Sequence, residues 1–92
     1  MSNSAKKRQV IITRQAERRM KRLPKPFIKR LQLAIKSLGD DPRPVGYKKM
    51  VEYDDLYRIC VGDWRVIYAI EDDRLLVLIV TVGPRGSVYR EL

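Results

Sequence analysis

The side chains best suited to chemistry in this chain are arginines and a tyrosine in its second half. Arg58 and Arg65 lie in two neighbouring β-rich runs. Arg85 and Tyr89 follow the last of these runs. The chain has no histidine and one cysteine, Cys60, which excludes Ser-His, Cys-His and histidine general-base mechanisms and argues against a metal site. An enzyme with this sequence must therefore work without histidine.

Positive charge is concentrated in the first half of the chain. Residues 1–50 hold 15 basic and three acidic side chains, whereas residues 51–92 hold five basic and eight acidic ones, and the net charge is +9. A cationic half on a small domain indicates a polyanionic partner, most often nucleic acid; the alternative is a domain that is merely basic. The candidate phosphate-binding residues of this half are Arg18, Arg19, Arg22, Lys29, Arg30, Lys48 and Lys49.

The length of 92 residues allows one domain. We expect a flexible basic tail over residues 1–8 and one domain over residues 9–92. No apolar run approaches the ~20 residues of a membrane-spanning helix, and no apolar core follows the basic start. A single cysteine fits a reducing compartment. We therefore expect a cytoplasmic protein with no membrane partner and no cofactor.

The first half predicts a strand followed by two helices. The β-branched run Gln9–Thr13 predicts a strand, and Thr13 is placed to cap a helix over Arg14–Leu23. Apolar residues recur at helical spacing from Phe27, and Gly39 is the expected C-cap of this second helix. The two helices should form a hairpin that is basic outside and apolar inside.

The second half changes to the period of strands. Gly62-Asp63 and Asp72-Asp73 are expected to form two-residue hairpin turns. The predicted strands are Lys48–Val51, Leu56–Val61, Trp64–Ile70 and Leu75–Val82. The fold class is therefore α+β, in the order β-α-α-β-β-β, with the helical hairpin packed on one face of a small antiparallel-rich sheet.

The two turns assign side chains to the faces of this sheet. An aromatic and branched set should share the face that the helices cover; it comprises Tyr57, Ile59, Val61, Trp64, Val66 and Tyr68. Arg58, Cys60 and Arg65 should lie on the opposite face, which we call the open face. The same reasoning places Val82 there, together with an apolar strip. The strip consists of Ile67, Leu76, Leu78 and Val80, and such a surface suggests a partner segment that covers it.

Three segments of the chain resemble the RelE/ParE toxin superfamily, over roughly residues 9–90. They are RLPKPFIKRLQLAIKSLGDDPRP, YRICVGDWRVIYAI and VLIVTVGPRGSVY. The middle segment is the most specific, and the resemblance favours the RelE branch over the gyrase-poisoning ParE branch. It implies a RelE-like fold and a metal-independent mRNA endonuclease that acts on the ribosome and is neutralised by a cognate antitoxin.

Carried over by position, the resemblance implies roles for four residues. Arg58, Arg65, Arg85 and Tyr89 match catalytic positions of RelE-like toxins. Cys60 stands where such toxins often have a second basic residue. The alternative is that Arg58 and Arg65 are solvated residues of a polar sheet face and that Tyr89 is a packing residue.

The implied partners are the 70S ribosome with its mRNA and an antitoxin that covers the apolar strip. Lys48 and Lys49 would hold RNA backbone, and operator DNA would be reached only through the antitoxin. Two alternatives stay open: a ParE-like inhibitor of DNA gyrase, and a catalytically weak co-repressor, which the cysteine at position 60 favours.

Overall fold

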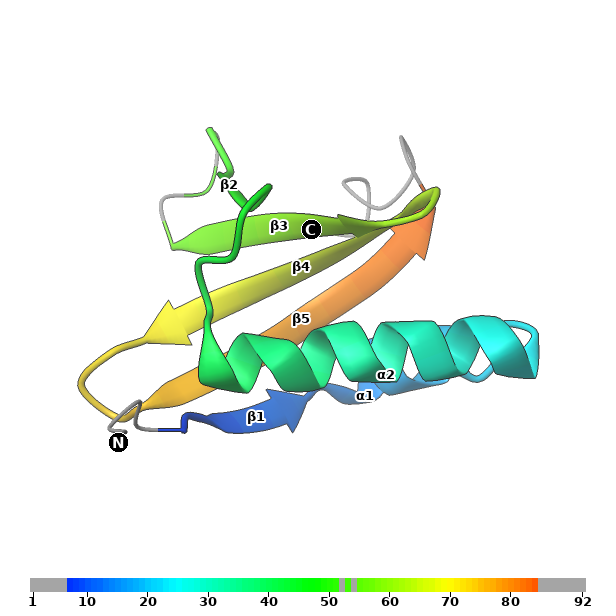
Figure 1. Cartoon of the computed structure of the whole chain (residues 1–92), viewed down its shortest axis with the longest axis horizontal. Helices are drawn as coiled ribbons and strands as arrows, with labels where there is room; N and C mark the ends of the chain where they lie inside the picture. Colours follow the sequence, from blue (N-terminus) through cyan, green and yellow to red (C-terminus); the bar gives the residue numbers. More distant parts are fainter. Residues whose placement is uncertain (1–6, 52, 54, 85–92) are drawn as a thin grey trace.

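Two helices cover one face of a five-stranded sheet in the computed structural model, which describes residues 7–51, 53 and 55–84 (Figure 1). The elements are β1 (Gln9–Ile12), α1 (Arg14–Met20), α2 (Lys25–Asp40), β2 (Lys48–Lys49), β3 (Leu56–Val61), β4 (Trp64–Glu71) and β5 (Leu76–Pro84). The strand order is β1-β5-β4-β3-β2, with β1 parallel to β5 and the other pairs antiparallel. The predicted α+β class is confirmed. Among the described residues, neither helix combines the length and apolar content needed to cross a membrane.

The first helix begins where the sequence predicts and ends earlier. The Thr13 hydroxyl accepts a hydrogen bond from the backbone N–H of Ala16 at 3.2 Å, as an N-cap does. The helix ends at Met20 instead of Leu23, because the N–H of Leu23 bonds to the Met20 carbonyl in a tightened last turn. Pro24 follows at once and disfavours helical geometry in the residue before it.

Gly39 is not the C-cap of α2, which continues to Asp40. Gly39 is buried, and a Cβ atom there would lie 3.0 Å from both the Arg8 carbonyl oxygen and Val10 Cγ2. The Arg8 N–H donates to the Gly39 carbonyl at 2.8 Å. Glycine is therefore required for the close approach of β1 to the helix, and Arg8, which the sequence assigned to the basic tail, is anchored to the domain.

The first hairpin turn is the expected one, and the second is longer. Val61 pairs with Trp64 across a two-residue turn in which Gly62 has a φ of 61°. The second turn spans four residues, because Glu71 pairs with Leu76. Two aspartates are poorly suited to a turn that needs positive φ at both central residues, whereas the longer turn needs it only at Leu75, where φ is 51°. The change moves β5 by two residues relative to β4, which keeps Leu76 and Leu78 on the open face.

A β-bulge in β5 reverses the face assignment of Val82. Tyr68 pairs with Ile79 whereas Ile67 pairs with Thr81, so Val80 is the extra residue. The Val80 carbonyl accepts a 2.7 Å hydrogen bond from the Thr13 hydroxyl, which ties the bulge to the start of α1. Beyond the bulge the alternation is inverted, and Val82 is fully buried in the core beneath the helices. The prediction that Val82 lies on the open face is therefore wrong.

The core beneath the helices carries the aromatic and branched set predicted for that face. Ile59, Val61, Val66 and Tyr68 are buried there, and Tyr57 and Trp64 pack against them. The hydroxyl of the fully buried Tyr68 donates to the Pro42 carbonyl at 2.7 Å, and burial raises the pKa of this phenol.

Ion pairs fix the loop that follows Pro42. Asp72 in the β4–β5 turn bridges Arg8 at 2.8 Å and Arg43 at 3.1 Å. Hydrogen bonds from both arginines hold the pKa of Asp72 below its usual range. Because Arg8 precedes β1 and Arg43 precedes β2, this carboxylate ties both edges of the sheet to the central hairpin.

Replacing Tyr68 with phenylalanine tests the buried hydroxyl. Tyr68→Phe should lower the free energy of unfolding by about 1–2 kcal/mol at pH 7, because the Pro42 carbonyl loses its partner. The raised pKa means that this tyrosine stabilises the fold below about pH 10 and that its contribution is lost as pH rises above that value. Urea unfolding of parent and variant at pH 7 and again above about pH 10 measures how the difference in the free energy of unfolding changes. An identical pH dependence in parent and variant would contradict it.

Candidate functional site

Three cationic side chains lie together on the open face. Arg65 pairs with Cys60, Arg58 lies two residues before Cys60 on the same strand, and Lys48 pairs with Arg58. Because alternate residues of a strand share a face, Lys48, Arg58 and Arg65 form what we call the open-face basic cluster. Both arginines are half-buried, and Arg58 Nη1 donates to Cys60 Sγ at 3.6 Å. Guanidinium groups held in this way on a sheet suit phosphate groups.

The two lysines of β2 lie on opposite faces of the sheet. Lys49 pairs with Tyr57, a residue of the helix-covered face, so only Lys48 belongs to the open-face basic cluster. Met50, which has the same alternation as Lys48, packs on Ile67 on the open face. Sequence reasoning treated the two lysines alike, because it assigned no faces within the predicted strand Lys48–Val51, of which the structure forms only Lys48–Lys49.

The last two predicted catalytic residues, Arg85 and Tyr89, lie outside the described residues. The described chain ends at Pro84, which pairs with Trp64, and the preceding Gly83 pairs with Arg65. The last described residues of β5 therefore lie beside Arg65 of the open-face basic cluster.

The basic residues of the helices form a separate surface on the other side of the sheet. Of the five predicted phosphate-binding residues in this region, Arg19 is half-buried and four are exposed: Arg18, Lys29, Arg30 and Arg22, which follows the end of α1. The guanidinium of Arg30 lies 5.3 Å from the ring centroid of Phe27, which in turn lies 6.0 Å from the ring of Trp64. The sheet thus separates two cationic surfaces, as expected from a helical hairpin that is basic outside and from arginines on the opposite sheet face.

The apolar strip differs from its prediction at one residue. Leu76, Leu78 and Val80 are half-buried on the open face. Ile67 is fully buried, because Met50 packs over it with the help of Tyr53, Leu56 and Val80. Ile67 is therefore part of a small second core and is not available to a partner.

Ile11 takes the place of Ile67 in the strip. It pairs with Leu78 and is 40% exposed, and Leu78 pairs in turn with Ala69. The branched run of β1 shows no polar alternation, so only its pairing with β5 reveals which isoleucine lies on the open face.

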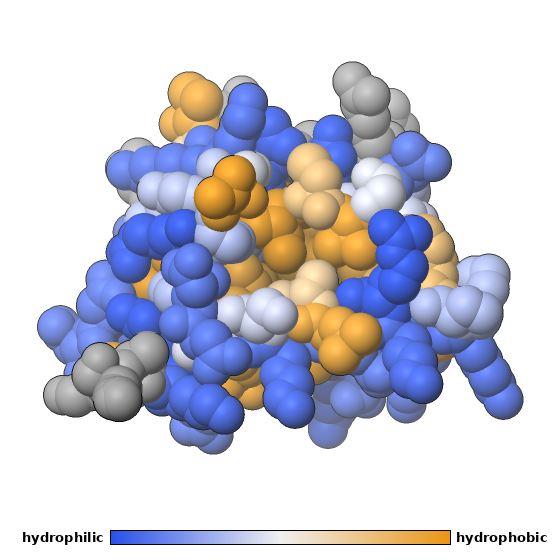
Figure 2. All heavy atoms as spheres, in the orientation of Figure 1, coloured by the Kyte–Doolittle hydropathy of each residue, from blue (hydrophilic) through white to orange (hydrophobic). Residues whose placement is uncertain are grey.

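An apolar groove of about 420 Å³ lies between α2 and β3 and is a feature that the sequence did not predict. Figure 2 shows hydrophobic atoms gathered in this hollow of the helix-side face, with hydrophilic atoms around it. Its walls come from distant segments, among them Ala34 and Leu38 of α2, Val45 of the following loop, and Ile59 and Val61 of β3. No local pattern connects these residues.

Comparison with known proteins identifies relatives of the chain. The family model described as "ParE toxin of type II toxin-antitoxin system, parDE" matches residues 10–89. The chain is 30% identical over 82 residues to Toxin RelE from Mycobacterium tuberculosis, with 88% of this chain and 84% of the relative covered.

Solved structures show the same fold. The archaeal RelE–RelB complex from Pyrococcus horikoshii matches with a TM-score of 0.77 and 29% identity, covering 87% of this chain and 97% of that one. The RelBE2 toxin–antitoxin complex from Mycobacterium tuberculosis matches with a TM-score of 0.74 and 25% identity, covering 86% and 99%. A free mutant of E. coli RelE, at 20% identity and a TM-score of 0.75 over 92% and 93%, supports the fold alone. With its sheet, its helical hairpin and these relatives, the chain belongs to the RelE/ParE superfamily of type II toxin–antitoxin toxins.

Proposed function

We propose that this toxin is a ribosome-dependent mRNA endonuclease and that a cognate antitoxin neutralises it. The observation that carries the proposal is the open-face basic cluster: Lys48, Arg58 and Arg65 stand in register on the sheet face that the helices leave uncovered. The similarity to Toxin RelE from Mycobacterium tuberculosis supports the activity. The complexes of related RelE proteins with RelB antitoxins support the partner.

The proposed reaction is attack of an RNA 2′-oxygen on the adjacent phosphorus. The new O2′–P bond forms as the P–O5′ bond breaks; the 2′-hydroxyl loses its proton and the leaving 5′-oxygen gains one. Negative charge grows on the non-bridging and leaving oxygens, where permanently charged guanidiniums are most useful. We assign this stabilisation to Arg58, Arg65 and Arg85, and we assign base stacking or proton transfer to Tyr89. The positive charge comes from these side chains, so the proposed reaction is metal-independent.

The ribosome has two tasks in this proposal. No strong general base stands among the candidate residues, so alignment of the mRNA must supply much of the rate. The helical cations on the other side of the sheet bind ribosomal RNA while the open face holds the message. This binding surface consists of Arg18, Arg19, Arg22, Lys29 and Arg30.

Two alternatives have an observation in their favour. The matching family model carries the ParE name, which favours a ParE-like inhibitor of DNA gyrase. Cys60 in the middle of the open-face basic cluster favours a weak enzyme that acts as a co-repressor with its antitoxin. Primer extension on mRNA after brief induction separates them: new 5′ ends within translated codons support the endonuclease. A DNA-damage response without such ends supports gyrase inhibition, and neither effect supports the co-repressor.

The catalytic assignment predicts the effect of removing one guanidinium. Arg65→Ala and Arg85→Ala should each slow single-turnover cleavage of ribosome-bound mRNA by about 10²-fold or more, because transition-state charge loses a partner. Arg74→Ala is the matched control, since Arg74 is an exposed arginine in the turn at the far end of β4. Full activity in a folded Arg65→Ala protein would remove the assignment of that residue.

The helical surface predicts a steep salt dependence of ribosome binding. Each neutralised phosphate should add about 0.7–0.9 to the slope of log K against log salt concentration. Combining Arg18→Gln with Arg22→Gln should lower both the affinity and the slope, with little effect on the cleavage rate at saturating ribosome. Sedimentation binding assays between low and physiological salt measure this, and a flat dependence would exclude electrostatic docking.

The apolar strip predicts where a charge disrupts antitoxin binding. Leu78→Glu should weaken it by about 2 kcal/mol or more, because an unpaired carboxylate enters a dry contact. Val51→Glu is the control, since Val51 is almost fully exposed outside the strip. Calorimetric titration measures the affinities, and circular dichroism verifies the free folds. Equal affinity of the folded Leu78→Glu protein and the parent would show that the strip is not the interface.

A further inference from the structure

One arginine of the helical surface is held against an aromatic ring. The guanidinium carbon of Arg30 lies over the ring of Phe27, 5.3 Å from its centroid, which is within the range of a cation–π contact. The Phe27 ring in turn contacts Trp64, with the two centroids 6.0 Å apart and the ring planes inclined at 54°. Arg30 is exposed, whereas both rings are half-buried. The rings therefore form a packed support beneath an exposed guanidinium.

The turn between β3 and β4 leaves one side of this guanidinium uncovered. A Cβ atom at Gly62 would lie 3.5 Å from Phe27 Cζ and 3.8 Å from both terminal nitrogens of Arg30. A side chain at position 62 would therefore lie directly against the guanidinium and the ring. Glycine, which the φ of 61° also favours here, keeps that space open.

The donors of this guanidinium are not used by the fold. Within the described part of the chain, no residue forms an ion pair or a hydrogen bond with the Arg30 guanidinium. Arg43 is the contrasting case: its guanidinium lies 6.0 Å from the centroid of the Tyr57 ring, but it is also paired with Asp72. Of these two arginines over rings, one stabilises the loop before β2 and the other presents its charge and its donors to solvent.

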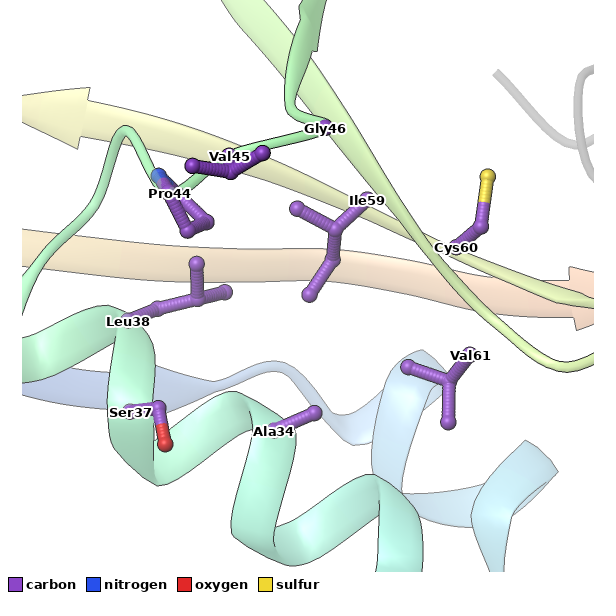
Figure 3. Close-up of a pocket in the computed structure, with 9 residues that line it drawn as sticks. All are labelled: Ala34, Ser37, Leu38, Pro44, Val45, Gly46, Ile59, Cys60 and Val61. Atoms are coloured by element: carbon purple, nitrogen blue, oxygen red, sulfur yellow. The ribbon is translucent and has the colours of Figure 1, made fainter.

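The Arg30 site lies at one end of the apolar groove. Ala34 follows Arg30 by one helical turn, and Val61 directly precedes Gly62. Figure 3 shows the side chains of Ala34 and Val61 directed toward each other across the groove. A ligand on the guanidinium therefore meets apolar surface on that side as well as positive charge. Such surroundings favour a flat, polarisable ring over a bare phosphate.

From this geometry we propose that the exposed side of the Arg30 guanidinium binds an unpaired RNA base by stacking. Guanidinium planes and aromatic rings are the surfaces on which proteins stack unpaired bases. Because the guanidinium already lies over Phe27, little conformational freedom is lost when a base covers its other side. Lys25 and Lys29 are exposed at the same end of α2 and would hold the flanking phosphates.

A stacking site adds selectivity to a surface that otherwise recognises charge. Phosphate contacts do not distinguish paired from unpaired RNA, whereas a base inside a duplex has both of its faces covered and cannot stack on Arg30. The helical surface would therefore prefer a loop or bulge in which a base is unstacked. This inference rests on the proposed function for the identity of the polyanion as RNA, but its test needs neither ribosomes nor cleavage.

The test compares two oligonucleotides that carry the same charge. One is a fluorescein-labelled pentamer of 2′-O-methyl adenosine, in which the methyl groups prevent attack by the 2′-oxygen; the other has the same backbone without bases. Fluorescence anisotropy at physiological salt measures both affinities for the full chain. Every chain tested carries Tyr89→Ala, because the proposed function assigns base stacking to Tyr89 as well. The adenosine pentamer should bind about tenfold more tightly than the abasic one.

Two substitutions locate the base, and a third is the matched control. Arg30→Lys keeps the charge but removes the guanidinium plane, and Gly62→Asn places a side chain against that plane in a residue that tolerates positive φ. Each should weaken binding of the adenosine pentamer about tenfold and leave the abasic affinity unchanged. Arg18→Lys makes the first change on α1 and should alter neither affinity. The emission of Trp64, the only tryptophan, verifies that the rings stay packed in each variant.

Two results would overturn the inference. They are equal affinity of the parent for the two oligonucleotides, and unchanged adenosine affinity in the folded Arg30→Lys protein. The outcome is separable from that of the proposed function. Retained mRNA cleavage in the unmodified chain without base-dependent binding would remove the stacking site and leave the endonuclease. Base-dependent binding that Arg30→Lys abolishes, in a chain that cleaves no mRNA, would support the stacking site and remove the endonuclease.

Discussion

The register of β3 against β4, which the tight turn at Gly62 sets, is the constraint on which both surfaces of this protein depend. A slip of one residue would turn one strand over relative to the other: with β4 in place, Arg58 would lie beneath the helices and Ile59 on the open face. Burying one unpaired guanidinium costs several kcal/mol, which is a large share of the net stability of a small domain. The hydrophobic face therefore enforces the position of the cationic one, and the candidate site is a consequence of the core.

The β-bulge at Val80 lets one strand serve both faces of the sheet. Before the bulge β5 presents Leu78 to the open face, and after it β5 presents Val82 to the core. The Thr13 hydroxyl holds the bulge carbonyl while its oxygen also caps α1. One side chain thereby joins the start of the helical hairpin to the irregular point of the central sheet. The inverted alternation also brings Gly83, which has no side chain, next to Arg65, so nothing from β5 covers the guanidinium there.

Local patterns in the sequence predicted the elements, the helix-covered face and the shared face of Arg58, Cys60 and Arg65, because each depends on near neighbours. A two-residue turn and period-two alternation are sufficient for that inference. The features that sequence reasoning missed depend on distant contacts. Gly39 is a glycine because β1 approaches α2, and Ile67 is buried because Met50 folds back over it. The groove takes its walls from three segments of the chain, and the facing of Ile11 follows only from its pairing with β5.

The two cationic surfaces make different demands on an inhibitor. In the proposed function the helical cations bind ribosomal RNA through charge, and such binding weakens as the salt concentration rises. The open face instead offers an apolar strip, with Leu76, Leu78 and Val80, on the same face as two guanidiniums. Affinity gained from apolar contact depends little on salt. Under the proposed function, a partner that covers the strip therefore keeps its affinity under ionic conditions that weaken ribosome binding, which is the order of affinities that a neutralising partner requires.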